Sequence, residues 1–144
     1  MAQNLGLGTA MIALVVLVHT LGLTFLAGTM QRIVRWFRLH HHHFGKTIAM
    51  VLTVLGVFAI HTLEIWGWAG LYLYTGAVKG IESAVYFSTV TFSTVGYGDI
   101  TLDPAWRLMA SLEGINGFIV IGWSTAFLVT ASTRFGPFRA GEHF

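Results

Sequence analysis

Few side chains in this sequence could take part in chemistry, and several of them are histidines or carboxylates inside apolar stretches. The chain has no cysteine, which excludes disulfides, thiolate metal sites and thiol catalysis. His19 and His61 lie in different apolar stretches and could together ligate a haem, as in membrane cytochromes. Polar contacts between helices are the favoured interpretation, because Glu64 lies one helical turn from His61.

A basic segment follows the first apolar stretch and carries two further patterns. Arg32, Arg35 and Arg38 recur at every third residue, which is the spacing of voltage-sensing helices. They follow a charge-free stretch and lack surrounding helices with acidic partners, so we interpret them as anchors at the membrane interface. The histidines at 40–43 could bind a divalent metal or titrate near neutral pH, but a solvated basic patch is favoured.

The composition is that of a membrane protein. Of 144 residues, 55% are hydrophobic and only 10% are charged, and the mean hydropathy is +0.71. The net charge of +2 could suggest nucleic acid, but the eight Lys and Arg are spread thinly among apolar runs, so we expect no nucleic-acid partner. Little length is left over for a separate water-soluble catalytic or sensor domain, and we expect none.

Three stretches are long enough to cross a bilayer, for which roughly 20 apolar residues suffice. The first covers about residues 5–30; a cleaved signal peptide is the less favoured alternative, since no Lys or Arg precedes it. The second covers residues 46–68 and ends in Trp66 and Trp68, which we read as anchors at the headgroup level. The third covers residues 104–132, with Asp103 as the expected N-cap and Pro104 at the first helical position.

The basic residues predict the orientation. Six of the eight Lys and Arg flank the apolar stretches on one side, at residues 32–46 and 134–139, and the positive-inside rule makes that side cytoplasmic. We therefore expect a multi-pass protein of the cell (inner) membrane, with its N-terminus outside and its C-terminus in the cytoplasm. Residues 69–102 must then begin and end outside.

Within this outer segment, residues 81–93 are apolar and compatible with a helix, but about 13 residues reach only roughly 20 Å, less than the hydrocarbon thickness. The helix can enter the membrane but cannot cross it. Non-helical backbone at membrane depth is tolerated only beside protein or a watery cavity, so the residues that follow should line a protected path.

Those residues read Thr94-Val95-Gly96-Tyr97-Gly98-Asp99. Here the chain resembles the bacterial potassium channel pore-domain family, whose selectivity filter reads Thr-Val-Gly-Tyr-Gly. The resemblance covers about residues 50–133, and a glycine-rich turn is the less favoured alternative. We call residues 94–98 the filter segment.

The resemblance implies that backbone carbonyls of Thr94, Val95, Gly96 and Tyr97 coordinate K⁺, with Gly98 completing the segment. Gly96 and Gly98 can take positive φ at little steric cost, so that consecutive carbonyls face one axis while Val95 and Tyr97 point into the wall. One chain supplies too few oxygens for a cage, which implies a homotetramer. Asp99, at the outer mouth, would concentrate cations.

Some members of the family carry a Glu four residues before the filter Thr, where this chain has Val90. Tyr86, Phe87 and Trp106 are therefore expected to support the filter by aromatic packing and a hydroxyl. Glu113 lies inside the third span and is costly there without a partner. We expect it to form a structural hydrogen bond to the pore-helix or filter backbone, with direct ion coordination less favoured.

Glycines punctuate the third span, and the family's inner helix bends at a glycine, which by alignment is Gly117. Hinge and close packing are about equally supported for this residue. Ile121 and Thr125 should share its face and line the cavity beneath the filter.

The sequence thus predicts an all-α membrane protein with three transmembrane helices, a re-entrant pore helix and a filter per chain. The expected parts are an N-terminal helix and basic loop (1–45), a pore domain (46–133, with outer helix 46–68, pore helix 81–93, filter 94–99 and inner helix 104–132) and a short tail (134–144). The expected function is a passive, potassium-selective channel in membrane lipid, not an enzyme, with no cofactor beyond permeant K⁺. A weakly selective cation channel is the near alternative; a haem protein or a potassium-uptake subunit is less favoured.

Overall fold

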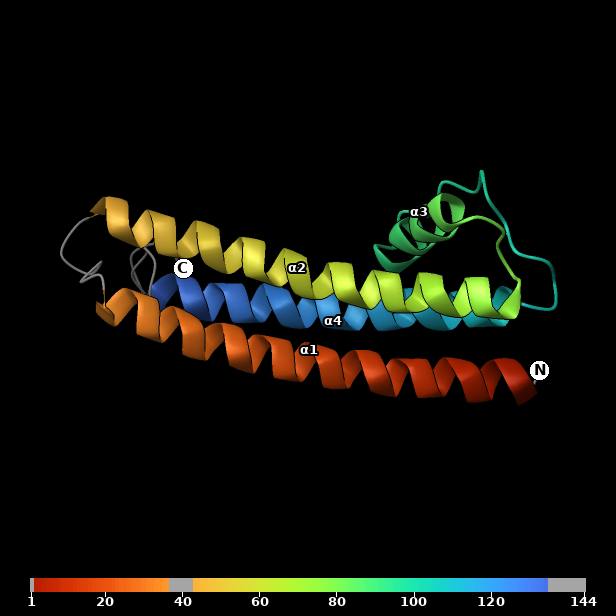
Figure 1. Ribbon diagram of the computed structural model, residues 1–144, viewed down its shortest axis with the longest axis horizontal. Coiled ribbons are helices and arrows are strands. Elements are labelled where there is room, and N and C mark those ends of the chain that lie inside the picture. The colour runs from red at the N-terminus through yellow and green to blue at the C-terminus, as the bar shows by residue number, and fades with distance from the viewer. Residues whose placement is uncertain (1, 37–42, 135–144) are drawn as a thin grey trace.

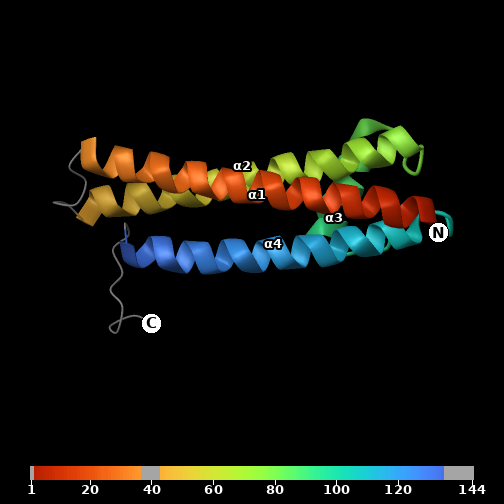
Figure 2. The ribbon, with the colours of Figure 1, turned by 90° about the horizontal axis from the view of Figure 1, so that it is seen from below.

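The computed structural model describes residues 2–36 and 43–134, which form four helices. Three are long: α1 (Ala2–Trp36), α2 (His43–Thr75) and α4 (Arg107–Arg134). They lie side by side along most of their length, and Figures 1 and 2 show them as one elongated bundle. All three are long and apolar enough to cross a membrane, as predicted.

The short helix α3 (Ile81–Phe92) lies obliquely against α2 and α4 at one end of the bundle. The start of α1, the end of α2 and the start of α4 lie at that same end (Figure 1). With 12 residues, α3 is too short to cross a bilayer, and the chain enters and leaves it from one end of the bundle. The prediction of a re-entrant helix at 81–93 is confirmed to within one residue, since Ser93 is the C-cap.

The second helix is longer than predicted. It continues past Trp68 to Thr75 because Trp68, Ala69 and Tyr72 pack into the interior of the bundle, where they are almost fully buried. The reading of Trp68 as an interfacial anchor is therefore wrong, whereas Trp66 is half exposed. Burial of these aromatic side chains stabilises two further helical turns.

The fourth helix starts at Arg107 and not at residue 104. The Trp106 N–H donates to the Asp103 carbonyl oxygen at 2.8 Å, which makes residues 103–106 a turn that leads into the helix. The Arg107 Nε then donates to the Leu102 carbonyl oxygen at 3.1 Å. A proline at position 104 fits this turn as well as a first helical position, so the sequence pattern did not distinguish the two.

The main core cluster joins all four helices. It includes Val15 of α1, Trp68 and Tyr72 of α2, Phe87 of α3 and Met109 of α4. The additional helix α1 thus belongs to the same bundle as the rest of the chain. Gly56 of α2 lies against the Leu26 side chain of α1, which would have to shift if position 56 carried a methyl group.

Candidate functional site

The last turn of α3 leads directly into the filter segment. Ser93 N–H donates to the Thr89 carbonyl oxygen at 3.1 Å, and Thr94 N–H donates to the Thr91 carbonyl oxygen at 3.0 Å. Ala84, Phe87, Ser88 and Phe92 are the buried residues that hold the helix against the bundle. The C-terminal end of α3, which carries the negative end of the helix dipole, is thereby fixed beside the start of the filter segment.

The filter segment has an alternating backbone. Thr94, Gly96 and Gly98 have positive φ values of 61°, 52° and 78°, whereas Val95 and Tyr97 between them do not. The prediction that both glycines take positive φ is confirmed, and Thr94 extends the alternation by one residue. The left-handed conformation costs a residue such as threonine about 1–2 kcal/mol, so the surroundings must hold Thr94 in place. Alternation of this kind turns successive carbonyls toward the same side.

One further hydrogen bond fixes this segment to α3, from the Gly96 N–H to the Val90 carbonyl oxygen at 2.9 Å. The two residues that alternate with those of positive φ are only partly covered by the described part of the chain: Val95 is 53% exposed and Tyr97 is 73% exposed. A single chain therefore provides the alternating strand but not the wall around it.

Asp99 follows the filter segment and is held by Tyr86, which donates its hydroxyl proton to Oδ2 at 2.6 Å. This hydrogen bond lowers the pKa of the Asp99 carboxyl and raises the pKa of the Tyr86 hydroxyl. Tyr86 thus supplies the hydroxyl that the sequence led us to expect where Val90 replaces an acidic residue. The two residues join the first half of α3 to the end of the filter segment.

Replacing Tyr86 by phenylalanine should raise the pKa of Asp99, because the bond that favours the carboxylate is removed. If ion flux depends on the Asp99 carboxylate, lowering the pH should reduce flux at a higher pH in Tyr86→Phe than in the wild type. The pH dependence of ion flux in proteoliposomes measures this shift. Tyr74→Phe is a matched control, since Tyr74 is 85% exposed on α2. Equal pH profiles of ion flux for Tyr86→Phe and the wild type would contradict the prediction.

Glu113 of α4 is completely buried and connects three helices. Tyr72 of α2 donates to its Oε2 at 2.5 Å, and Ser88 of α3 lies 2.5 Å from its Oε1. The Ser88 hydroxyl also lies 2.9 Å from the Ile65 carbonyl oxygen, and the Phe87 ring packs edge-on against Tyr72. The predicted structural bond from Glu113 to the pore helix is present, but it is made to a side chain and not to the backbone.

Loss of the Glu113 carboxyl group should destabilise the chain, because it removes the acceptor of the buried Tyr72 hydroxyl and leaves the Ser88 hydroxyl with the Ile65 carbonyl oxygen. We expect Glu113→Ala to lower the free energy of unfolding by about 1–3 kcal/mol, and Glu113→Gln, which keeps an acceptor oxygen, to lower it less. Ser111→Ala is the control, since Ser111 is exposed and bonds only within α4. Denaturation in detergent measures the difference, and an alanine variant as stable as the Ser111 control would count against this role.

Gly117 of α4 lies directly beneath the end of α3. A methyl group on Gly117 would overlap the Phe92 carbonyl group, so the two backbones touch there. Close packing accounts for this glycine in the structure, where α4 is one continuous helix. The hinge interpretation stays a prediction.

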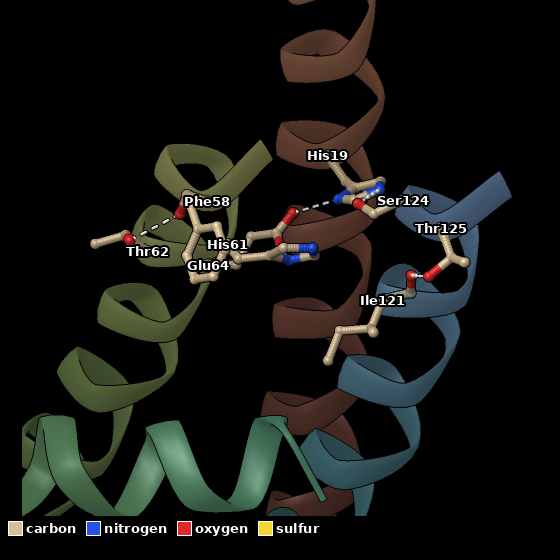
Figure 3. A network of polar contacts seen from close by, with 8 residues as sticks. All are labelled: His19, Phe58, His61, Thr62, Glu64, Ile121, Ser124 and Thr125. Atoms are coloured by element: carbon tan, nitrogen blue, oxygen red, sulfur yellow. Dashed lines mark hydrogen bonds and ion pairs between the residues drawn. The ribbon is translucent and has the colours of Figure 1, made fainter. Parts of the chain in front are cut away.

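Ile121 and Thr125 follow Gly117 along α4, and the Thr125 hydroxyl donates to the Ile121 carbonyl oxygen at 2.9 Å (Figure 3). Both line a cavity of about 390 Å³, together with Thr89, Phe92 and Ser93 at the end of α3. Residues of α2, among them His61, complete the lining of this cavity. That Ile121 and Thr125 line a cavity beneath the filter stays a prediction. Trp106, the remaining residue predicted to support the filter, is half-buried against the main core cluster.

The structure adds a polar cluster that the sequence predicted only in part. His61 Nδ1 lies 2.8 Å from Glu64 Oε2, which confirms the predicted contact between them, and His19 Nδ1 of α1 lies 2.8 Å from Oε1 of the same carboxylate. Figure 3 shows the carboxylate between the two imidazoles. These are the polar contacts between helices that the sequence favours over a shared haem.

Other residues singled out from the sequence contribute less. Arg32 is exposed near the end of α1, which is compatible with an interfacial anchor. The side chains of Arg35 and His43, and all of Arg38 and residues 40–42, lie outside the described part of the chain. Asn4 of α1 donates to the Ala105 carbonyl oxygen and so ties the first turn of α1 to the segment before α4.

Comparison with known protein families gives one result. A family model described as an ion channel matches residues 58–134, which include most of α2, all of α3, the filter segment and α4. No curated protein and no solved structure matches the chain. Helix α1 lies outside the matched region.

Proposed function

Since this chain belongs to the ion channel family, we propose that four copies assemble around one axis into a potassium-selective pore that conducts K⁺ passively across the cell membrane. The observation that carries the proposal is the alternation of positive φ at Thr94, Gly96 and Gly98. Four such strands would surround an axis with layers of carbonyl oxygens, which replace the hydration shell of a monovalent cation.

The surroundings of the filter segment support the same proposal. Val95 and Tyr97 are apolar side chains exposed in the single chain, and neighbouring copies would cover them. The negative end of α3 and the carboxylate of Asp99 both favour a cation along the pore. Glu113 and Tyr86 hold the pore helix and the outer mouth, so they are proposed as supporting residues and not as ion ligands.

In the proposed orientation, the filter segment and the N-terminus face the outside of the cell and the end of α4 faces the cytoplasm. The basic residues at 32–46 and 134–139, which lie in and beside the end of α1, the start of α2 and the end of α4, support this assignment. Ion channels move ions without chemical transformation, and we propose no enzymatic activity; conduction through the filter segment is proposed to need no cofactor besides permeant K⁺.

Ion selectivity is tested with the purified protein in proteoliposomes under opposed potassium and sodium gradients. We expect the reversal potential to follow potassium, by about 59 mV for each tenfold change in its concentration ratio. A reversal potential that does not change when the two ions are exchanged would favour a weakly selective cation channel instead.

The number of chains is tested by native mass measurement in a detergent that keeps channels intact. We expect a complex of four chains of 15.8 kDa each. A dimer as the largest species, with ion flux retained on reconstitution, would contradict the tetramer.

A further inference from the structure

His19, His61 and Glu64 form a cluster apart from the filter segment, deep in the bundle. Their three ligand atoms all lie within 4.8 Å of one another. The side chains of His19 and Glu64 are fully buried, and that of His61 is 16% exposed. The cluster joins α1 to α2, and His19 Nε2 also lies 3.5 Å from the Ser124 hydroxyl of α4 (Figure 3).

The carboxyl group of Glu64 lies between two imidazole partners, one from each of two helices. A carboxylate at this depth in a membrane-spanning bundle is costly unless a positive charge accompanies it. A divalent cation between the three side chains would supply that charge.

The donor set is also a recognised one for transition metals. Two imidazole nitrogens and one carboxylate oxygen leave a fourth position open in a tetrahedral zinc site. Bond lengths of 2.0–2.2 Å place the ligand atoms of such a site about 3.3 Å apart. The two histidines contact different oxygens of the Glu64 carboxylate, each at 2.8 Å, and the three ligand atoms lie within 4.8 Å of one another. Side-chain movements that bring both nitrogens toward one carboxylate oxygen would give the spacing of such a site.

The surroundings provide what a metal site needs beyond its ligands. The other ring nitrogen of His19 faces Ser124, which would orient the imidazole from the second coordination sphere. His61 and Ser124 both line the cavity of about 390 Å³ described above, which has room for a water as the fourth ligand.

We propose that His19, His61 and Glu64 bind one divalent transition-metal ion of the zinc type per chain, and that this ion clamps α1 to α2. The site is independent of which ion the filter segment selects. It gives the additional helix a chemical link to the pore domain, at a level of the bundle where α4 also contributes Ser124.

The test must exclude the chain's other histidines, which are His143 and residues 40–43. A background protein with all five replaced by glutamine keeps only His19 and His61. This protein is stripped with a chelator in detergent and titrated with Zn²⁺ alone, and with Co²⁺ to record ligand-field absorption. We expect one Zn²⁺ per chain and a Co²⁺ spectrum of tetrahedral type.

Variants in that background then identify the ligands. His61→Ala and Glu64→Gln should each weaken Zn²⁺ binding at least about 100-fold, and Ser124→Ala about 10-fold. Thr62→Ala is the matched control, because the Thr62 hydroxyl is exposed and bonds to the Phe58 carbonyl oxygen within α2 (Figure 3); it should leave binding unchanged.

If a variant fails to fold, the background protein still tests the proposal by its Zn²⁺ uptake, since it retains all three ligands. Absence of stoichiometric Zn²⁺ uptake by the folded background protein would show that the cluster is only a hydrogen-bonded one. Uptake that survives both His61→Ala and Glu64→Gln would likewise overturn the proposal, because the ion would then bind elsewhere.

Discussion

Gly96→Ala is expected to abolish potassium-selective flux while the protein still folds and inserts. Gly96 has a φ of 52° and lies in the middle of the filter segment, where its N–H is bonded to the Val90 carbonyl oxygen. Alanine in this conformation costs about 1–2 kcal/mol per residue, and in the proposed tetramer four chains would carry this strain in the same ring. The strand would relax toward negative φ and turn carbonyls away from the axis.

Gly76→Ala separates this effect from backbone strain in general. Gly76 has a φ of 70° in the turn after α2, and a methyl group at either glycine would meet nothing within 4 Å. The two substitutions therefore introduce similar strain without a clash, one inside the filter segment and one outside it. We expect Gly76→Ala to keep the reversal potential of the wild type. Potassium selectivity that persists in Gly96→Ala would remove this segment from the ion path.

Much of the fold could be predicted because a membrane limits the choices. Apolar length alone indicates which stretches can cross, and the shortness of residues 81–93 indicates a helix that cannot. The errors lie at helix ends, where local signals have two meanings. Trp68 resembles an interfacial anchor in the sequence, but it is buried because the bundle provides a core at that level. Only the packing of the other helices decides between these outcomes.

In the candidate site too, residue type predicts some features and only packing determines the others. The positive φ of Gly96 and Gly98 follows from residue type, since glycine adopts this conformation freely. The positive φ of Thr94 does not, because a threonine is held there only by its surroundings. The partners of Glu113 could not be predicted from the sequence either, because Tyr72 lies 41 residues away along the chain. The link between His19 and Glu64 spans 45 residues for the same reason, namely that the register of one helix against another is a property of packing.

Gly117→Ala is expected to reduce ion flux strongly. The structure attributes this effect to lost packing between α4 and α3, whereas the sequence alone left a helix hinge equally open. The new methyl group would overlap the carbonyl group of Phe92, and backbone atoms cannot yield as a flexible side chain can. The end of α3 would have to move away from α4, and the filter segment begins two residues later. We therefore expect selectivity to fail together with current.

Two other glycines of α4 provide matched controls, because each alanine changes helix propensity by the same amount, about 1 kcal/mol. A methyl group at Gly122 would meet nothing within 4 Å, and one at Gly114 would make an ordinary contact with the Thr91 carbonyl oxygen at 3.6 Å. Both variants should conduct with wild-type selectivity if packing against α3 is what position 117 requires. Single-channel recordings of the three variants distinguish the two interpretations. A Gly117→Ala channel that keeps its selectivity but opens less often would show that α4 bends at this residue, and that the contact with Phe92 can open without disturbing the filter segment.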